Sequence, residues 1–203
     1  MNLSDRNRER IAEAIRAAEA RTTGEIVCVL ARSSSDATAL SLFVAAVLSL
    51  ILPWLLVAFT ALAVREILLL QAAAFLVLAM LLCQPTVRVT LMPRAARRAA
   101  AYRAATDQFV ARGIARKKDR AGILIFVSLA ERYARIIADD GIAARVSQGE
   151  WQDAVDALIA HMRDGQIPDG FVAAIERCGN VLATHFPPTQ PGRAELPDRI
   201  YVI

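Results

Sequence analysis

The chain has 203 residues, of which 56% are hydrophobic, and its formal net charge is +4. That length suits one domain, and the apolar excess is above that of an ordinary soluble protein. Three cysteines without a CxxC pair argue against a disulfide scaffold or a zinc site. The sequence pI of 9.3 would suit nucleic acid. The chain lacks aromatic stacking positions, however, so no nucleic-acid partner is expected.

The first segment predicts a helix followed by a buried strand. Its charged start, MNLSDRNRER, lacks the early apolar core of a secretory signal peptide. Ser4 is an N-cap candidate for an amphipathic helix that runs to Arg21, and Gly24 is a stop signal. The β-rich run over 25–31, EIVCVLA, is typical of a buried strand.

The apolar stretch over 40–83 is too long for one membrane crossing and long enough for two. Arg65 and Glu66 interrupt it, and at the turn of a helical hairpin both charges could reach the headgroup layer. We therefore expect the turn of the hairpin at Arg65 and Glu66. The alternative is a charge pair buried between helices, with the turn near Pro53 and Trp54.

The distribution of arginines predicts the orientation of this hairpin. Basic residues follow the second crossing, whereas the turn carries one arginine. The positive-inside rule then places both termini and the soluble part in the cytoplasm. The expected location is a bacterial inner (plasma) membrane, crossed twice, with the lipid bilayer as a partner. The arginines expected at the membrane surface are Arg94, Arg97, Arg98 and Arg103.

The part after the hairpin predicts further helices and strands. The apolar run over 122–128, GILIFVS, is typical of a central strand, and the short link 129–131 predicts an antiparallel hairpin with the next run. Ser147 and Glu150 form a capping box. The expected elements are a helix over 93–113, strands over 122–128 and 132–138, helices over 151–162 and 169–185, and a Pro-rich tail whose end, 199–203, either adds an edge strand or stays loose.

The element order predicts an α/β fold: a small mixed β-sheet flanked by helices, with a two-helix transmembrane hairpin inserted after the first strand. The arms of a helical hairpin lie about 8–10 Å apart, so the hairpin can replace a surface loop. The predicted divisions are the first part of the domain over 1–38, the transmembrane hairpin over 39–84, the remainder of the domain over 85–188, and the tail over 189–203.

Ordered motifs across about two thirds of the chain resemble the TPM domain family. They are the strand GEIVCVL, the hairpin RAGILIFVSLAERYARIIADDGI and the closing pattern MRDGQIPDGFVAAI. This order resembles a membrane-anchored bacterial TPM-domain protein. The matching positions are Gly122, the run 123–127, Arg132, Gly141, Gly165 and Gly170.

The resemblance implies a mixed sheet flanked by helices. It also implies activities found among family members: acid phosphatases in plants, divalent-cation binders, and accessory subunits of membrane complexes. This chain departs from the family pattern at two places. It has ADDGI over 138–142 where many members have a Gly-rich turn followed by Glu, and Asp119-Arg120-Ala121 where many have paired Asn.

Antiparallel pairing should bring Asp119 close to Asp139 and Asp140, with Glu25 at the same end of the sheet. Oxygen ligands suit Ca²⁺ or Mg²⁺, which are the candidate cations, with Asp139, Asp140 and Asp119 as candidate ligands. The simpler alternative is that the basic run 116–120 neutralises these acids and that Asp139-Asp140-Gly141 is ordinary turn chemistry.

No other catalytic motif stands out, and His161 and His185 are expected at a helix end or the surface rather than as ligands. No cofactor and no catalytic residue can be assigned. We expect a membrane-tethered cytoplasmic module that binds or assembles with an unknown membrane-associated protein. The alternative is a metal-dependent phosphatase at the acidic end of the sheet, and the resemblance alone raises the question of enzymatic activity.

Overall fold

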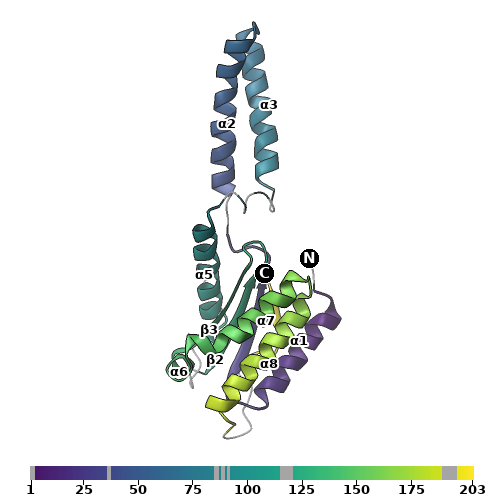
Figure 1. Ribbon diagram of the computed structural model, residues 1–203. Coiled ribbons are helices and arrows are strands. Elements are labelled where there is room, and N and C mark those ends of the chain that lie inside the picture. Colours follow the sequence, from purple (N-terminus) through teal and green to yellow (C-terminus); the bar gives the residue numbers. More distant parts are fainter. Residues whose placement is uncertain are drawn as a thin grey trace. The chain divides into compact units, whose positions relative to one another are not determined.

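The structure of the chain is a computed structural model that describes residues 3–35, 38–84, 87, 90, 92–114, 121–188 and 196–203 (Figure 1). Two compact units make up the chain, one of Met1–Ser34 with Ala101–Ile203 and one of Ser35–Ala100. The elements are α1 (Asp5–Glu19), β1 (Glu25–Ala31), α2 (Thr38–Phe59), α3 (Val64–Leu82), α5 (Arg94–Ala111), β2 (Gly122–Ser128), β3 (Tyr133–Ala138), α6 (Asp140–Ala143), the 3₁₀ helix η2 (Gln148–Trp151), α7 (Gln152–Arg163), α8 (Ile167–His185) and β4 (Ile200–Val202).

The first unit contains a four-stranded mixed sheet in the order β3-β2-β1-β4. β1 runs parallel to both β2 and β4, and β2 pairs with β3 in the antiparallel sense. Every residue of β1 and β2 is buried, as befits central strands covered on both faces. The predicted mixed sheet flanked by helices is confirmed, and β4 settles the open question of the tail end by adding a parallel edge strand.

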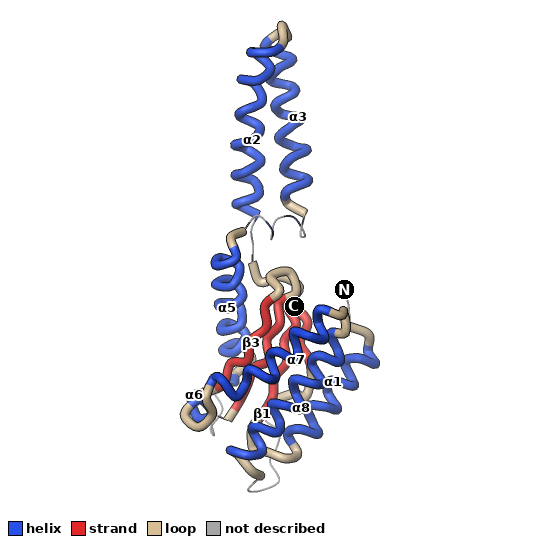
Figure 2. Tube along the Cα trace, viewed as in Figure 1, coloured by secondary structure: helices blue, strands red, loops and turns tan. Residues whose placement is uncertain are grey.

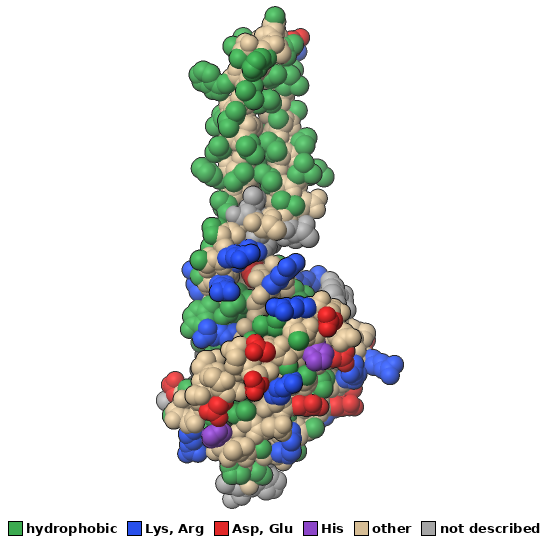
Figure 3. Space-filling model, viewed as in Figure 1, with side chains coloured by type: hydrophobic (Ala, Val, Ile, Leu, Met, Phe, Trp, Pro, Cys, Tyr) green, Lys and Arg blue, Asp and Glu red, His purple; other side chains and the backbone are tan. Residues whose placement is uncertain are grey.

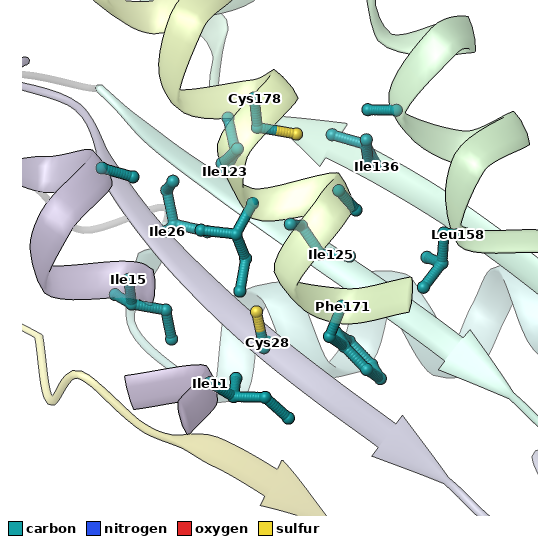
Figure 4. Close-up of a cluster of buried hydrophobic side chains, with 14 of the residues drawn as sticks. Ile11, Ile15, Ile26, Cys28, Ile123, Ile125, Ile136, Leu158, Phe171 and Cys178 are labelled. Carbon is teal, nitrogen blue, oxygen red and sulfur yellow. The ribbon is translucent and has the colours of Figure 1, made fainter. Parts of the chain in front are cut away.

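Alternating side chains of the central strands supply two separate hydrophobic clusters. On one face, Ile26, Cys28, Ile123 and Ile125 pack with residues of α1, α7 and α8, including Phe171 (Figure 4). The other face carries the second cluster, in which residues of β1 and β2 pack with α5. Figure 2 shows α5 running beside the sheet. Because both faces of these strands are buried, their sequences are continuous apolar runs and do not alternate between apolar and polar residues.

Local signals in the sequence start and end the helices of this unit. The Ser4 side chain accepts a hydrogen bond from the Asn7 N–H at 3.3 Å and caps α1. Ser147 and Glu150 form the predicted capping box at η2, which continues into α7. Gly165, at φ 75°, ends the turn after α7. A Cβ at Gly170 would lie 3.1 Å from the Leu158 carbonyl oxygen, so a side chain there would force α7 and α8 slightly apart.

The second unit contains the apolar helices α2 and α3, which pack side by side as a hairpin. With 22 and 19 residues, they are about 33 and 28 Å long at 1.5 Å per residue, enough for a bilayer core. Buried residues make up only 11% and 6% of their most apolar windows, so little of this apolar surface is covered within the described structure. Their surface is almost entirely apolar in Figure 3.

The turn of the hairpin lies slightly earlier than the sequence suggested. The connecting loop is residues 60–63, and Arg65 and Glu66 stand in the first turn of α3. Glu66 is there because its carboxylate accepts the N–H of Ala63 at 3.2 Å, which caps the helix. The alternative turn near Pro53 is not adopted, since α2 continues through this proline.

Candidate functional site

Two acidic residues lie at the end of the sheet where β1 and β2 begin. Glu25 pairs with Gly122 in the parallel register of β1 and β2. On the other side of β2, the N–H of Asp139 donates to the carbonyl of Gly122 at 2.9 Å. Glu25 and Asp139 thus lie at the same end of the sheet, as expected, but with β2 between them their backbones stand about 10 Å apart.

Asp139 has a structural task at this end of the sheet. It is the N-cap of α6, and its Oδ1 accepts the N–H of Asp140 at 2.8 Å. The residue is only 6% exposed, and its second oxygen, Oδ2, is buried without a hydrogen bond to any described residue. Asp140 is exposed in the first turn of α6. Asp119 and the basic run 116–120 lie outside the described residues.

The acids at this end do not by themselves amount to a metal site. Within the described ranges, no three His, Cys, Asp or Glu side chains gather closely enough to hold an ion. Asp139 Oδ2 offers one suitable oxygen, whereas Ca²⁺ takes six to eight and Mg²⁺ takes six. A cation bound by Asp139, Asp140 and Asp119 thus stays a prediction, and we derive no chemical step from it.

A second polar cluster occupies the opposite end of the central strands. The Ser34 hydroxyl donates to Ser128 Oγ at 2.7 Å, and the Ser128 hydroxyl donates to the Glu131 carboxylate. That carboxylate also accepts the Ser34 N–H at 3.0 Å and the Ser33 hydroxyl at 3.1 Å. Glu131 therefore ties the segment after β1 to the β2–β3 turn, and this network explains its burial.

The histidines and cysteines are engaged elsewhere. His161 Nδ1 lies 2.9 Å from the Ala157 carbonyl oxygen, and His185 Nε2 lies 3.0 Å from Glu150 Oε2. The Ser147 N–H, and after it His185, lower the pKa of Glu150. Cys28 and Cys178 are free thiols in the core, and burial raises the pKa of both, to about 12 for Cys178. Such thiols are not nucleophiles at neutral pH.

The arginines expected at a membrane surface are all on α5. Arg94, Arg98 and Arg103 are exposed, and Arg97 is half-buried. No carboxylate of the described part of the chain forms an ion pair with any of the four. Their side chains are consequently available to an anionic surface.

Two openings in the described part of the first unit lie along the outer edge of β3. A cavity of about 480 Å³ is lined by Tyr133 and Ala134 of β3 and by the end of α7. A second cavity of about 330 Å³ is lined by β3 residues 135–138, by Tyr102 of α5 and by Trp151. We call these two cavities together the β3 cleft.

Three arginines give the β3 cleft its charge. Arg132 and Arg163 line the larger cavity, and Arg135 lines the smaller one. The guanidinium carbon of Arg135 lies 4.8 Å from the centroid of the Tyr102 ring, a cation–π contact. The Nε of Arg135 is buried without a hydrogen bond to any described residue. No Asp or Glu side chain is among the described residues that line either cavity.

Arg132 has a backbone conformation that residues other than glycine rarely adopt. Its φ is 50°, and within the described ranges no other residue except glycine has a positive φ. Hairpin loops commonly place their last residue in this left-handed region, where glycine is favoured. An arginine there costs about 1–2 kcal/mol relative to an ordinary conformation. The sequence reasoning named Arg132 only through the family resemblance and missed the cleft. The signal available was an arginine at the left-handed position of a short hairpin loop.

Comparison with known proteins bears directly on this fold. The TPM domain family model matches residues 84–181. The chain contains a TPM domain. The match begins after the α2–α3 hairpin, yet β1 pairs with β2 along its whole length and α1 packs on α8. Residues before the hairpin are therefore part of the same folded unit as most of the matched segment.

One solved structure shares the fold of this chain. It is the NMR structure of BA42 protein from the psychrophilic bacterium Bizionia argentinensis sp. nov.. The TM-score is 0.64 at 21% sequence identity, and the alignment covers 100% of this chain and 97% of that one. No curated protein matches the chain. The comparisons thus support the TPM domain and its fold, and they assign no activity.

Proposed function

We propose that this chain is a membrane-anchored TPM domain that binds a membrane-associated protein, with the β3 cleft as its binding surface. The cleft carries the proposal. Its described lining consists of aliphatic and aromatic side chains, arginines and short polar groups. Apolar walls with a few fixed polar groups are typical of binding surfaces, and Tyr, Trp and Arg are enriched where binding energy concentrates.

The anchor in this proposal is the α2–α3 hairpin. Both helices are long and apolar enough to cross a bilayer, and large side chains such as Trp54, at 81% exposure, have no protein neighbour to cover them. The arginines of α5 and the positive-inside rule support cytoplasmic termini. We expect Ala61→Cys to react with a membrane-impermeant maleimide in intact cells, in a Cys83→Ser background, and Ile203→Cys to react only after permeabilisation. Labelling at 203 without permeabilisation would refute this topology.

Site-specific photo-crosslinking tests the binding role. A photoreactive residue at Ala134, in the β3 cleft, should give a discrete adduct with a membrane protein in cells. The same residue at Ala17, an exposed alanine on α1, is the matched control and should give none. Equal adducts at both positions, or none at Ala134, would contradict the proposal.

The competing activity is a metal-dependent phosphatase. It draws on the phosphatase in the name of the matching family model and on the buried, unbonded Oδ2 of Asp139. Hydrolysis of p-nitrophenyl phosphate by the purified full chain, measured with Mg²⁺ or Ca²⁺, separates the two. Robust turnover that disappears in Asp139→Asn/Asp140→Asn would overturn the binding proposal in favour of catalysis.

A further inference from the structure

β3 is an edge strand whose outer side is unpaired in the described structure. The backbone N–H of Asp139 points to β2. Because the direction of the backbone N–H and C=O groups alternates along a strand, those of residues 133, 135 and 137 also point to β2. The backbone groups of Ala134, Ile136 and Ala138 point away from it. No described residue forms a hydrogen bond with these groups. Ile136 is 0% exposed, so its outward groups lie in a buried setting where an unmade hydrogen bond is costly.

Two of the usual protections of an edge strand, proline and a glycine bulge, are missing from β3, although neighbouring residues cover the strand at Ile136. Its sequence, YARIIA, contains no proline or glycine. Its single charged residue, Arg135, lies over the ring of Tyr102. A strand edge whose outward backbone groups have no partner is a template for another strand, which here would have to displace the residues that cover Ile136.

The β3 cleft follows this edge rather than one face of the sheet. Tyr133 belongs to the hydrophobic cluster on the α5 face and Ala134 to the cluster on the α7 face, yet both line the larger cavity. At the smaller cavity, Ile137 belongs to the cluster on the α5 face and Ala138 to the cluster on the α7 face, and both line the cavity. A strand added to β3 would therefore have space for its side chains on both of its faces.

The charge of the cleft selects the added strand. Arg132, Arg135 and Arg163 line it, one of them with a buried, unbonded Nε, and no described acid lines it. Resting on the proposed binding function, we infer that β3 accepts an extended acidic segment of a partner protein as a fifth strand. Backbone groups of the segment bond Ala134, Ile136 and Ala138. Its Asp or Glu side chains meet the arginines, and its intervening apolar side chains fill the cavities.

A second copy of this chain is a poorer occupant. In the antiparallel register that pairs Ala134 of one copy with Ile136 of the other, the two copies of Arg135 would lie directly opposite each other. Like charges directly opposite each other on paired strands are destabilising. An acidic residue at that position of the incoming strand avoids this repulsion.

Amide hydrogen exchange of the full chain in lipid nanodiscs tests the inference. The probe is a capped ten-residue peptide of alternating Glu and Val. A Lys–Val peptide controls for charge, and a Glu–Pro peptide, which cannot pair as a strand, controls for backbone bonding. We expect the Glu–Val peptide to slow exchange across 133–138 about tenfold, with no change in α1. The two control peptides should leave exchange unchanged.

Two variants make the outcome specific. Ala134→Pro removes an outward N–H that β2 does not use, so the fold should persist while protection by the peptide is lost. Arg135→Glu should abolish protection by the Glu–Val peptide and gain protection by the Lys–Val peptide. Equal protection by the Glu–Pro peptide, or no protection by any peptide, would overturn the inference. Protection that rises with protein concentration alone would identify a second copy instead. An adduct at Ala134 in cells without peptide protection would leave the binding function standing and refute the strand.

Discussion

Glu19, the last residue of α1, should make the stability of the domain fall as pH rises. Its Oε1 accepts the N–H of Ile26 at 2.7 Å, and its side chain also bonds Asp198, which precedes β4. Burial, followed by the charges of Asp198 and Glu25, raises the pKa of Glu19 from 4.5 to about 8, although the Ile26 N–H acts in the opposite direction. We therefore expect a protonated Glu19 in the folded chain at neutral pH.

Proton linkage explains why stability should fall, and not rise, with increasing pH. Below pH 4.5 the residue is protonated in both folded and unfolded chains and contributes no pH dependence. Between pH 4.5 and about 8 only the folded chain holds the proton, so stability is lost progressively as pH rises, and the loss levels off above 8. The difference between the two pKa values corresponds to at most about 5 kcal/mol.

Glu19→Gln isolates this effect because the amide oxygen can still accept the Ile26 N–H. We expect the variant to match the wild type near pH 4.5 and to be more stable at pH 8, by at most about 5 kcal/mol. Glu13→Gln, an exposed site on the same helix, should show no such divergence.

Fluorescence can follow the unfolding of the TPM domain alone. The chain has two tryptophans, and Trp151 is 1% exposed in the core whereas Trp54 is on α2. In a Trp54→Phe background, urea unfolding of the full chain in detergent then reports on Trp151. A stability difference between Glu19→Gln and wild type that stays constant from pH 5 to 9 would refute the reasoning.

Three further predictions test packing, strain and the acidic end. Gly170→Ala should lower the free energy of unfolding by about 1–3 kcal/mol because the new Cβ would lie 3.1 Å from the Leu158 carbonyl oxygen. Gly149→Ala, the control, should lower it far less, and equal urea midpoints for the two variants would contradict this prediction. Arg132→Gly should raise the free energy of unfolding by up to about 1 kcal/mol, because glycine adopts a φ of 50° without strain, and it should weaken binding of the Glu–Val peptide. A loss of stability would show that the arginine has stabilising contacts. Asp139→Asn/Asp140→Asn should change the free energy of unfolding by under about 1 kcal/mol, since Asn also caps helices. Calorimetry should detect no divalent-cation binding to either the wild type or the variant. A metal-dependent rise in the melting temperature of the wild type that the variant lacks would instead establish the cation site.

Much of the fold could be predicted because its signals are local. Ser4, and the pair Ser147 and Glu150, cap helices within a few residues of themselves. The apolar runs of β1 and β2 have the composition of strands buried on both faces, and the short loop before Tyr133 allows only a hairpin. The turn between α2 and α3 was misplaced by a few residues because charges in a first helical turn look, in the sequence, like charges in a loop.

The candidate site was less accessible to the same reasoning. Proximity of the acidic strand ends follows from strand pairing, so Glu25 and Asp139 could be placed at one end of the sheet. The β3 cleft draws its walls from α5, β3, η2 and α7, and no spacing rule connects Tyr102 with Arg135 or Arg132 with Arg163. Hydrophobic patterns specify which side of an element is buried, but not which distant element covers it.

The sequence by itself determined the elements of this protein, the apolar hairpin long enough for a membrane, and the family order of its motifs, because each depends on composition and periodicity over short stretches. Only the tertiary structure decided that β4 closes one edge of the sheet and leaves β3 open. It alone brought Glu19 against Asp198 from the other end of the chain, and set three arginines along the open edge. These features depend on strand order and on the packing of helices over it, which long-range burial of apolar surface selects.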